Sequence, residues 1–428
     1  MTYQETINYL FNQLPMFQRT GKAAYKANLD TTLALDGYFD HPHKNFRCIH
    51  VAGTNGKGSV SHTLASVLQS AGYKVGLYTS PHLRDFRERV KINGEMISEN
   101  AVVDFVASHK TKFEELSPSF FEMTVALAFD HFAKEKVDVA VIEVGLGGRL
   151  DSTNIIDPLL TVITNISFDH TSLLGNSIPV IAGEKAGIIK NNIPVVIGER
   201  HPESQKVFMD KAESHSAPIL FAEDEFELLE TDLQEDFLHL VFKDINSENK
   251  LSLKSDLLGI YQVKNIRTAL VALNQLNQIG FNLTEEIIKD GISKIVDQTS
   301  LLGRWQRLGN NPRIICDTGH NVAGVSEILK QLNSLHFKHL HMVIGMVDDK
   351  DIDEVLSLLP KNATYYFTKA SIPRALNEEI LKEKADKFQL KGNTFKTVTE
   401  ALGASKKKAD KDDLIFVGGS TFIVAEVV

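Results

Sequence analysis

The sequence predicts an α/β protein in which a P-loop-type domain with a mostly parallel sheet precedes a smaller Rossmann-like α/β domain. Apolar, strand-like segments alternate with segments of helical periodicity along most of the chain, a pattern typical of parallel sheets joined by crossover helices. A glycine-rich turn connects the first clear strand to a helix. A second strand and helix, with polar residues between them, begin near residue 313 and indicate the second domain.

The first strand, turn and helix form a βαβ unit. We expect one strand at Phe46–Val51 and the next at Lys74–Thr79. Between them, apolar residues fall at helical spacing, namely Val60, Leu64, Val67, Leu68 and Ala71. Gly72 is expected to end this helix, because glycine readily adopts the left-handed conformation that closes many helices.

Further elements complete the two domains. In the first, we expect strands at Val137–Val144, Leu159–Ile166 and Ile193–Ile197, a β-rich extension at 217–254 and a helix at Tyr261–Leu276. In the second, we expect strands near 313–316, 340–345 and 413–418 and a helix near 322–335. The pattern breaks around Asp297–Trp305, so we place a larger domain at 1–298 and a smaller one at 299–428. A cleft between two domains is a common substrate site.

Length and composition narrow the functional classes. The chain has 428 residues, which is long for one domain and ordinary for two. Hydrophobic residues make up 43% and charged residues 24%, as in soluble globular proteins. The formal net charge is -9, so nucleic acid is not expected as a partner, because binding its phosphates requires an excess of Lys and Arg. Small anionic substrates remain compatible, since they respond to local charge.

The cysteines and the N-terminal segment bear on the cellular compartment. Cys48 and Cys316 each fall in a strand-like segment, so we expect two buried thiols and no disulfide. The N-terminal segment has no basic region followed by an apolar stretch, and no stretch approaches the ~18 apolar residues of a membrane span. We therefore expect a cytoplasmic protein without membrane contact, and a monomer.

Residues Gly53-Thr54-Asn55-Gly56-Lys57-Gly58-Ser59 follow the first strand and have the composition of a phosphate-binding loop. Glycines let backbone N–H groups turn toward an anion, and the N-terminus of the next helix adds unpaired N–H groups. Lys57 is suited to the β/γ-phosphates and Ser59 to Mg²⁺. Gly58 separates Lys57 from Ser59, unlike the usual G-K-[ST] ending. The alternative, an incidental glycine-rich turn, is disfavoured by the flanking strand and helix.

Acidic and histidine residues follow two predicted strands. Glu143 ends the strand Val137–Val144, and Asp169-His170 follow the strand Leu159–Ile166. In a parallel sheet, the carboxyl ends of strands face the ligand. A strand-capping Glu and a structural His are the alternatives for each position alone. With a phosphate loop on the same sheet, metal binding is favoured for both positions. These two candidate ligands together with Ser59 indicate more than one Mg²⁺.

Three other polar positions are open to two interpretations from the residues alone. Lys185 stands beside Glu184, which by itself indicates a solvated surface pair. Asp317-Thr318-Gly319-His320-Asn321 lies between a strand and a helix, where Asp317 or Asn321 could simply cap the helix. Arg304, near the expected domain boundary, is either a surface residue or a cation that stabilises a phosphoryl group during transfer.

Nine segments run in one order from residue 50 to residue 321: HVAGTNGKGSV, TSPHL, ERVKING, SFFEMTVALAF, VIEVGLGGRLDSTNII, ITNISFDHTSLLG, GEKAGIIK, GRWQ and DTGHN. Together they resemble the folate branch of the Mur ligase superfamily, the folylpolyglutamate synthase and dihydrofolate synthase family. The looser C-terminal remainder also fits, so the resemblance covers nearly the whole chain. The combination of segments is specific, although no single segment is.

The resemblance implies roles for nucleotide and metal. The expected ATP-binding residues are Thr54, Asn55, Gly56, Lys57, Gly58, Ser59, Asn265, Arg304 and Asp317. The expected Mg²⁺ ligands, for two ions, are Ser59, Ser80, Glu143 and His170. Lys185 resembles a lysine that the family carbamylates, which replaces its interpretation as a surface residue. The residues with an implied catalytic role are Lys57, Lys185, His170, Arg304 and His320.

The resemblance also implies an acceptor site. The residues similar to pterin-side contacts of bifunctional members are Ser119, Phe120, Phe121, Glu122, Leu150, Asp151 and Ser152. Bifunctional members carry a Gly-Leu-Glu-like element ahead of the phosphate loop, where this chain has Asn28-Leu29-Asp30. The acidic group is retained and the glycine is not. The resemblance therefore supports glutamate addition more strongly than the use of dihydropteroate.

The expected function is an ATP-dependent ligase that adds L-glutamate to a folate through an acyl phosphate, with dihydropteroate as a possible second acceptor. One alternative is a peptidoglycan-type Mur ligase, but those enzymes carry a UDP-sugar domain ahead of the phosphate loop, and here the loop begins at residue 53. Another alternative is a non-catalytic nucleotide-dependent switch, which would not need the second cluster at Arg304 and Asp317–Asn321.

Overall fold

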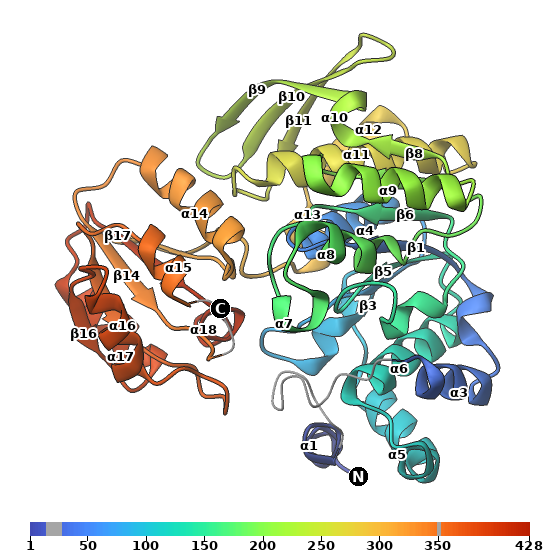
Figure 1. The fold of residues 1–428 in the computed structure, drawn as a ribbon, viewed down its shortest axis with the longest axis horizontal. Helices are drawn as coiled ribbons and strands as arrows, with labels where there is room; N and C mark the ends of the chain where they lie inside the picture. The colour runs from blue at the N-terminus through green and yellow to red at the C-terminus, as the bar shows by residue number, and fades with distance from the viewer. Residues whose placement is uncertain (14–27, 349–351) are drawn as a thin grey trace. The chain divides into compact units, whose positions relative to one another are not determined.

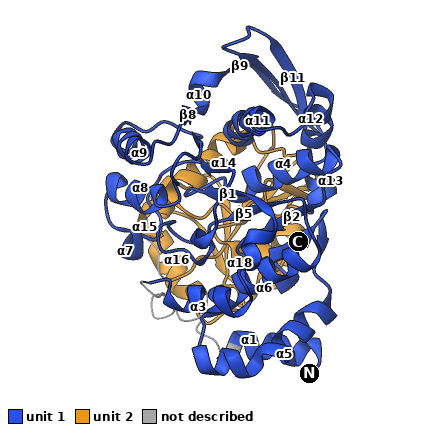
Figure 2. Cartoon of the chain, turned by 90° about the vertical axis from the view of Figure 1, so that its right-hand side faces the viewer, with its two compact units in different colours: residues 1–256, 262–300 blue, residues 257–261, 301–428 orange. Residues whose placement is uncertain are grey.

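The computed structural model describes residues 1–13, 28–348 and 352–428. The chain forms two compact units, coloured separately in Figure 2. Unit 1 comprises residues 1–256 and 262–300, and unit 2 comprises residues 257–261 and 301–428. The short segment 257–261 thus belongs to unit 2, although unit 1 residues flank it on both sides.

Unit 1 is built on an eight-stranded sheet with the order β4-β3-β2-β5-β1-β6-β7-β8. The strands from β2 to β8 in this order are parallel, whereas β3 and β4 are antiparallel. This confirms the predicted mostly parallel sheet. The strands are β1 Arg47–Ala52, β2 Val75–Tyr78, β3 Val90–Ile92, β4 Glu95–Met96, β5 Val139–Glu143, β6 Leu160–Ile163, β7 Val195–Ile197 and β8 Ile219–Phe221.

Helices cover both faces of this sheet, as Figure 1 shows for α4 and α11 on one side and α6 on the other. Buried strands need such cover, because they are apolar on both faces. The α-helices of unit 1 are α1 Tyr3–Gln13, α3 Asp30–Tyr38, α4 Lys57–Ser70, α5 Glu99–Leu116, α6 Phe120–Lys134, α7 Thr171–Leu174, α8 Ile178–Ala186, α9 Pro202–Ser214, α10 Ala222–Glu225, α11 Gln262–Gln278, α12 Glu285–Ile292 and α13 Ile295–Thr299. Short 3₁₀ helices are η2 Pro42–Asn45, η3 Phe86–Arg89 and η4 Ser152–Ile155.

The β-rich extension predicted at 217–254 divides into two parts. Its first strand, β8, belongs to the main sheet. The rest forms a separate antiparallel sheet of β9 Phe226–Leu233, β10 Leu238–Asp244 and β11 Lys250–Ser255, in the order β11-β10-β9. The alternating apolar pattern of Leu238–Phe242 fits a sheet with one covered face, because alternate side chains point to the same side.

Unit 2 contains a six-stranded sheet with the order β12-β13-β17-β14-β15-β16, in which only β12 is antiparallel. Its strands are β12 Gln306–Asn310, β13 Arg313–Cys316, β14 Leu340–Ile344, β15 Thr364–Phe367, β16 Gly392–Thr394 and β17 Leu414–Gly418. Its helices are α14 Val322–Ser334, α15 Ile352–Leu358, α16 Glu378–Asp386, α17 Val398–Lys408 and α18 Thr421–Ala425. Apolar residues from the strands and helices form its core.

The predicted elements are present, with ends shifted by up to three residues. Strand β6 ends at Ile163 rather than Ile166, because the chain turns away to form a loop beside the phosphate loop. Cys48 and Cys316 are free and buried in β1 and β13, as expected. Within the described ranges, no helix has the length and apolar character needed to cross a bilayer.

Candidate active site

The carboxyl ends of four neighbouring strands bring the polar residues of unit 1 together. The phosphate loop follows β1, which lies between β5 and β6 in the sheet. Glu143 ends β5 and pairs in register with Val51 of β1. Ser80 follows β2, the other neighbour of β5, and its backbone N–H donates to Glu143 Oε2 at 3.3 Å. Glu143, predicted from its strand-end position, and Ser80, which only the resemblance implied, therefore lie next to each other.

The segment after β6 fixes the shape of the phosphate loop. Asn165 accepts the Thr54 N–H at its carbonyl and the Asn55 N–H at Oδ1, both at 2.9 Å. The Thr164 hydroxyl donates to the Asn55 carbonyl at 2.5 Å, and the Thr54 hydroxyl donates to the Ser167 carbonyl at 3.2 Å. These bonds satisfy backbone groups that would otherwise be unpaired and hold the loop ready for a ligand.

The glycines of the loop are required by its geometry. Gly53 and Gly56 have φ values of 145° and 82°, in the region that side chains rarely adopt. A Cβ on Gly56 would lie 2.2 Å from Asn265 Oδ1, so only glycine allows Asn265 of α11 to contact the loop. The predicted ATP-binding residue Asn265 therefore lies against the phosphate loop, and its Nδ2 donates to Gln262 Oε1 at 2.7 Å.

Two lysines share the carbonyl oxygen of Gly53. Lys57, the first residue of α4, donates from Nζ to the carbonyls of Gly53 and Thr54, each at 3.1 Å. Lys185 of α8 donates to the same Gly53 carbonyl at 2.8 Å. Both predicted catalytic lysines therefore meet at the phosphate loop, and together they give it local positive charge.

The position of Lys185 corrects the interpretation drawn from the residues alone. Lys185 is only 4% exposed and is not paired with Glu184, which binds Arg149 at 2.9 Å instead. Burial, followed by the positive charge of Lys57, lowers the pKa of Lys185 to about 7. The helical spacing of α8 turns Lys185 inward and Glu184 outward, so the two neighbours in sequence do not form a pair. The resemblance, which places Lys185 at the site, agrees with its position.

The predicted Mg²⁺ ligands differ in how closely they are brought together. Ser59 is 1% exposed, and its Oγ has no hydrogen-bond partner among the described residues. Glu143 is 3% exposed and contacts Ser80 as described above. His170 has a left-handed backbone and precedes α7, with Nε2 3.8 Å from Asp169 Oδ2. No three His, Cys, Asp or Glu side chains of the described chain form a metal-binding group by themselves. Hydroxyl and carboxylate oxygens are nevertheless the donors that Mg²⁺ prefers.

The first set of predicted acceptor residues begins helix α6. Ser119 and Glu122 form a capping box, in which Glu122 accepts the Ser119 N–H at 2.6 Å and the Ser119 hydroxyl accepts the Glu122 N–H at 3.2 Å. Phe120 is buried in the core of unit 1. Phe121 is half-buried, and its ring covers Gly145, where a Cβ would lie 2.4 Å from the ring. Of the four, Phe121 is the residue placed beside the strand-end loop.

The second set of predicted acceptor residues closes that loop. Asp151 is 5% exposed, and its carboxylate accepts the Leu146 N–H at 2.9 Å, the Thr153 N–H at 3.0 Å and the Thr153 hydroxyl at 2.5 Å. Burial raises the pKa of Asp151, and these hydrogen bonds oppose that rise. Ser152 is buried and Leu150 is half-buried. Asp151 thus organises the loop that carries Leu150 and Ser152.

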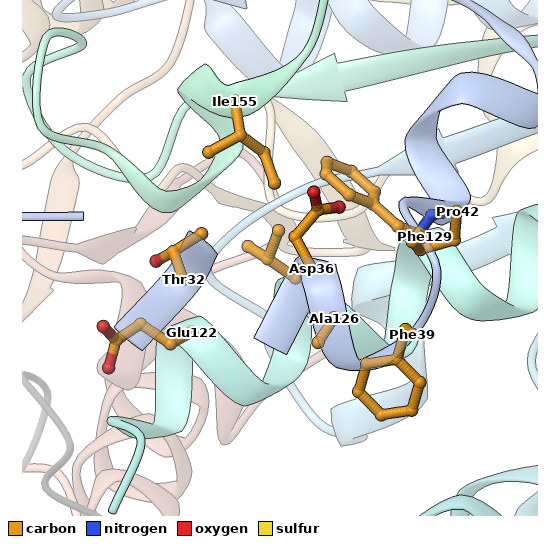
Figure 3. Close-up of a pocket in the computed structure, with 9 residues that line it drawn as sticks. Thr32, Asp36, Phe39, Pro42, Glu122, Ala126, Phe129 and Ile155 are labelled. Atoms are coloured by element: carbon orange, nitrogen blue, oxygen red, sulfur yellow. The ribbon is translucent and has the colours of Figure 1, made fainter. Parts of the chain in front are cut away.

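A small pocket lies beside Glu122 (Figure 3). Glu122, Thr32 and Asp36 supply its polar groups, and its apolar lining is Phe39, Pro42, Val125, Ala126, Phe129 and Ile155. The Thr32 hydroxyl is buried and has no partner among the described residues. Asp36 accepts hydrogen bonds from the two rings of His41 and His43 at 2.6 and 2.7 Å.

Asp317 is the centre of the polar cluster of unit 2. It is 3% exposed and accepts the Tyr261 hydroxyl at 2.5 Å and the N–H groups of Trp305 and Gly319 at 2.8 Å each. Burial raises the pKa of Asp317, against the effect of these donors and of Arg304.

The cap of helix α14 is Asn321, whose Oδ1 accepts the Gly324 N–H at 2.8 Å. The two possibilities for this segment are thereby separated: Asn321 caps, and Asp317 does not.

Arg304 and His320 lie next to Asp317 in the same unit. Arg304 is half-buried and donates to the Thr318 hydroxyl and, at 3.3 Å, to the Gly303 carbonyl. The His320 Nδ1 lies 2.9 Å from the Thr318 carbonyl, which can only accept, so Nδ1 carries a proton. The residues predicted from GRWQ and DTGHN thus form one cluster.

Several structural residues of the site were not singled out from the sequence. Tyr261 was expected to begin a helix, but it precedes α11 and binds Asp317. Thr164, Asn165 and Ser167 hold the phosphate loop. Thr164 and Asn165 lie in the last residues of the predicted strand Leu159–Ile166, and Ser167 follows it directly. This strand-end position beside the loop is the feature that could have identified them, by the same argument that identified Glu143.

Comparison with known families gives two matches. A model of the Mur ligase middle domain matches residues 51–273. A model of the Mur ligase glutamate ligase domain matches residues 303–421. The first match includes the phosphate loop, Glu143, His170, Lys185 and Asn265. The second includes Arg304 and the Asp317 cluster.

Individual relatives show which group of Mur ligases the chain is similar to. The chain is 31% identical to the dihydrofolate synthase/folylpolyglutamate synthase of Bacillus subtilis, over 99% of this chain and 98% of that protein. A probable bifunctional folylpolyglutamate synthase/dihydropteroate synthase of Haloferax volcanii is 32% identical over all of this chain, which spans half the length of that protein. The structure of Escherichia coli FolC in complex with DHPP and ADP is similar with a TM-score of 0.87 and 32% identity, over 100% of this chain and 97% of that chain. The chain therefore belongs to the folylpolyglutamate synthase/dihydrofolate synthase family of the Mur ligases.

Proposed function

We propose that this protein is an ATP-dependent ligase that joins L-glutamate to a folate by forming a C–N bond. The observation that carries the proposal is the phosphate loop at Gly53, where Lys57 and Lys185 meet, in a chain similar along its full length to folylpolyglutamate synthases. ADP complexes of similar structures support ATP as the phosphate donor. We assign ATP binding to residues 1–298 and the C-terminal ligase domain to residues 299–428.

The proposed reaction has two steps. An oxygen of the folate carboxylate attacks the γ-phosphorus of ATP, so that the P–O bond to ADP breaks and an acyl phosphate forms. The glutamate amine then attacks the acyl carbon, loses a proton and expels phosphate, leaving an amide. A protein nucleophile is not needed, so catalysis consists of positioning and of stabilising the charge on the transferred group.

The phosphate loop supplies the first part of that stabilisation. Lys57 exchanges its contacts with the Gly53 and Thr54 carbonyls for the phosphates, and the loop N–H groups and the N-terminus of α4 hold the remaining charge. Thr54, Asn55, Gly56, Gly58 and Ser59 complete the proposed loop contacts. Asn265, which already touches Gly56, is placed to contact the nucleotide as well.

The residues present fit Mg²⁺, with two ions expected. The buried Ser59 hydroxyl without a partner and the buried Glu143 carboxylate beside Ser80 are the observations that support this fit. Ser59, Ser80, Glu143 and His170 are the proposed ligands. When bound, Mg²⁺ supplies positive charge that neutralises the phosphate oxygens.

Lys185 is proposed to be carbamylated. Carbamylation requires an unprotonated amine to attack CO₂, and the lowered pKa of about 7 makes that form accessible near neutral pH. The product is a carboxylate beside the phosphate loop, which turns a repulsive cation next to Lys57 into an attractive anion. Such a group would also orient ligands of the metal.

Unit 2 is proposed to complete the phosphate chemistry. Arg304 stabilises the transferred phosphoryl group, Asp317 contacts the nucleotide and His320 takes part in catalysis. The fixed geometry supports this assignment, because Asp317 orients the Trp305 backbone next to Arg304 while Thr318 contacts both Arg304 and His320. On the acceptor side, we propose Ser119, Phe120, Phe121, Glu122, Leu150, Asp151 and Ser152.

The experiment is ADP release by the purified protein with MgATP and L-glutamate, comparing tetrahydrofolate, dihydropteroate and a UDP-muramoyl peptide as acceptors. The proposal predicts release with tetrahydrofolate that depends on both acceptor and glutamate. A response to dihydropteroate as well would make the enzyme bifunctional. Release only with the UDP-muramoyl peptide would contradict the folate assignment, and hydrolysis independent of every acceptor would favour a nucleotide-dependent switch.

A further inference from the structure

A buried histidine lies on the strand that leads into the phosphate loop. His50 is in the middle of β1 and fully buried, and its Nε2 lies 2.8 Å from the Thr153 hydroxyl of η4. Thr153 is also fully buried, and its hydroxyl lies 2.5 Å from Asp151 Oδ1. Three side chains from two distant segments therefore form one line of hydrogen bonds.

The direction of these hydrogen bonds follows from their donors and acceptors. The Asp151 carboxylate accepts from the Thr153 hydroxyl, which has a single proton. The hydroxyl must then accept from His50, so the ring carries its proton on Nε2. Burial lowers the pKa of His50 to about 3, so the ring is neutral and Nδ1 is unprotonated. Nδ1 is buried without a partner among the described residues.

The chain of hydrogen bonds ends on the loop that follows Glu143. Asp151 also accepts the Leu146 N–H at 2.9 Å, which closes the loop between residues 145 and 151. From the same loop, the Arg149 N–H donates to the Glu184 carbonyl at 2.8 Å, one residue before Lys185. Phe121 covers Gly145 at the start of the loop. The loop thus connects both sets of acceptor residues with the helix of Lys185.

A purely structural function would not require a histidine here. An aliphatic residue would fill a buried strand position, whereas an imidazole loses hydration and leaves one nitrogen unpaired. The imidazole fixes the orientation of its hydrogen-bond partners. Its Nε2–H sets the orientation of the Thr153 hydroxyl, and that hydroxyl sets the orientation of the Asp151 carboxylate. Buried polar networks define a single geometry when their members are hydrogen-bonded.

We propose that His50 and Thr153 are positioning residues for the folate acceptor, acting through Asp151 on the loop 145–152. They do not contact the acceptor themselves. Together they hold the carboxylate and the loop in the one conformation that receives it. This inference rests on the proposed function, since it takes the acceptor to bind at Phe121 and at Leu150–Ser152.

The test is the Thr153→Val variant, which keeps the shape of the side chain and removes the hydroxyl. We expect the KM for the acceptor to rise about tenfold, the size expected for one hydrogen bond to a charged group. The KM for ATP should stay within about twofold, because the phosphate loop is held by Thr164, Asn165 and Ser167 instead. Thr153→Ser, which restores a hydroxyl, should recover the acceptor KM.

A double variant separates positioning from stability. Thr153→Val alone leaves the His50 Nε2–H buried without an acceptor and should lower the Tm, whereas His50→Leu/Thr153→Val removes both partners and should recover most of it. The proposal predicts that the acceptor KM stays high in the double variant, because Asp151 still lacks the hydrogen bond from the Thr153 hydroxyl. An acceptor KM that recovers together with the Tm, or that never changes in Thr153→Val, would overturn the proposal.

The assay uses whichever acceptor makes the wild-type protein release ADP. Lack of a wild-type response to tetrahydrofolate therefore contradicts the proposed function alone. A changed ratio of acceptor KM to ATP KM in Thr153→Val tests the positioning role in either case. If the KM for ATP rises as much as that for the acceptor, the network supports the phosphate loop, and the acceptor-specific inference is wrong.

Discussion

The Gly53 carbonyl accepts hydrogen bonds from two lysines that belong to different helices. Two ammonium groups on one oxygen repel each other, and only one of them is deeply buried. Lys185, at 4% exposure, is therefore the group whose pKa falls, while Lys57 extends from the first turn of α4 and stays half-buried. We therefore propose different tasks for the two lysines: Lys57 contacts the phosphates, and Lys185, whose pKa burial lowers to about 7, supplies a neutral amine near neutral pH.

Replacing Lys57 by Ala should lower kcat at least about 100-fold, the loss typical when one group that stabilises transition-state charge is removed. The fold should remain intact, because Lys57 contacts only carbonyls of its own loop in the bonds that it donates. ADP release and circular dichroism measure the two effects. Lys110→Ala, at an exposed position on α5, is the matched control and should leave kcat unchanged. Near-normal turnover of Lys57→Ala would contradict the phosphate-loop assignment.

Activity should depend on CO₂ with a pH profile set by Lys185. Its pKa of about 7 means that the reactive neutral amine becomes the major form as the pH rises through 7. Protein depleted of CO₂ should therefore regain activity when CO₂ is restored, and at equal dissolved CO₂ the gain should be larger at pH 8 than at pH 6. Native mass spectrometry should detect the added CO₂.

Lys185→Gln provides the control for that measurement, because an amide cannot be carbamylated. It should show low activity at every bicarbonate concentration. Full activity of the wild-type protein after complete removal of CO₂ would rule out the carbamate.

The same lysine shows what a sequence pattern cannot predict for a single residue. The segment GTNGKGS indicates a phosphate loop from its residue types alone, whereas the burial of Lys185 depends on which side of α8 packs inward.

At the scale of elements, helix α13 is held at both of its ends. Asp256 accepts the N–H groups of Val296 and Asp297 at 2.7 and 3.4 Å, at the start of the helix. At its end, the buried Lys91 donates to the carbonyls of Thr299 and Ser300 at 2.8 and 3.3 Å. Negative charge at the N-terminus and positive charge at the C-terminus of a helix are both favourable. These contacts compensate for a helix of only five residues.

Asp256→Asn should stabilise the protein near neutral pH and not in acid. Burial raises the pKa of Asp256 to about 6, so the folded protein binds this proton more tightly than the unfolded chain. The resulting stability is fully present below about pH 4 and is lost as the pH rises through 6. Asn keeps an acceptor oxygen without the buried charge, so we expect a gain of about 1–3 kcal/mol at pH 7.5 and little change at pH 4.

Urea unfolding at the two pH values measures this difference. Asp104→Asn, at an exposed position on α5, should change the free energy of unfolding little at either pH. A loss of stability at both pH values would mean that the attraction of the carboxylate to the start of α13 outweighs its burial.

Elements with strong periodicity could be predicted from the sequence. Strands β1, β2, β5, β6 and β7 of the first sheet and β13, β14 and β17 of the second are predicted because their apolar runs are continuous, and α4 and α14 because their apolar spacing is helical. Strands β15 and β16 of the second sheet are not predicted. Short antiparallel strands such as β3 and β4, of three and two residues, carry too little pattern to be identified. Helix α13 is also not predictable from its own residues, because Asp256 and Lys91, which bind its two ends, are distant in sequence.

At the scale of the whole molecule, the proposed chemistry uses one basic residue from each unit. Unit 1 contains Lys57 and unit 2 contains Arg304. Arg304→Ala should lower kcat about 100-fold or more, because it removes a cation from the transferred phosphoryl group. Its effect on the stability of unit 1 should be small. Arg307→Ala, on β12 of the same unit, is the control and should retain activity. Equal activity of the two variants would contradict the role of Arg304.

The order of the units along the chain is only partly visible in the sequence. The change of pattern near residue 300 is a feature of composition, but no pattern marks residues 257–261, which belong to unit 2 through bonds such as that of Tyr261 to Asp317. The assignment of residues 257–261 to unit 2 therefore depends on tertiary contacts alone. A cytoplasmic location, a monomeric state and the absence of nucleic-acid binding stay predictions.

The most direct test follows an oxygen atom through the reaction. A folate labelled with ¹⁸O in the reacting carboxylate is incubated with MgATP, L-glutamate and the enzyme, and the released phosphate is analysed by mass spectrometry. Formation of an acyl phosphate predicts one ¹⁸O in each phosphate and a folate product heavier by one glutamyl unit. Phosphate released without ¹⁸O would mean that water attacks ATP, and would contradict the proposed ligase mechanism.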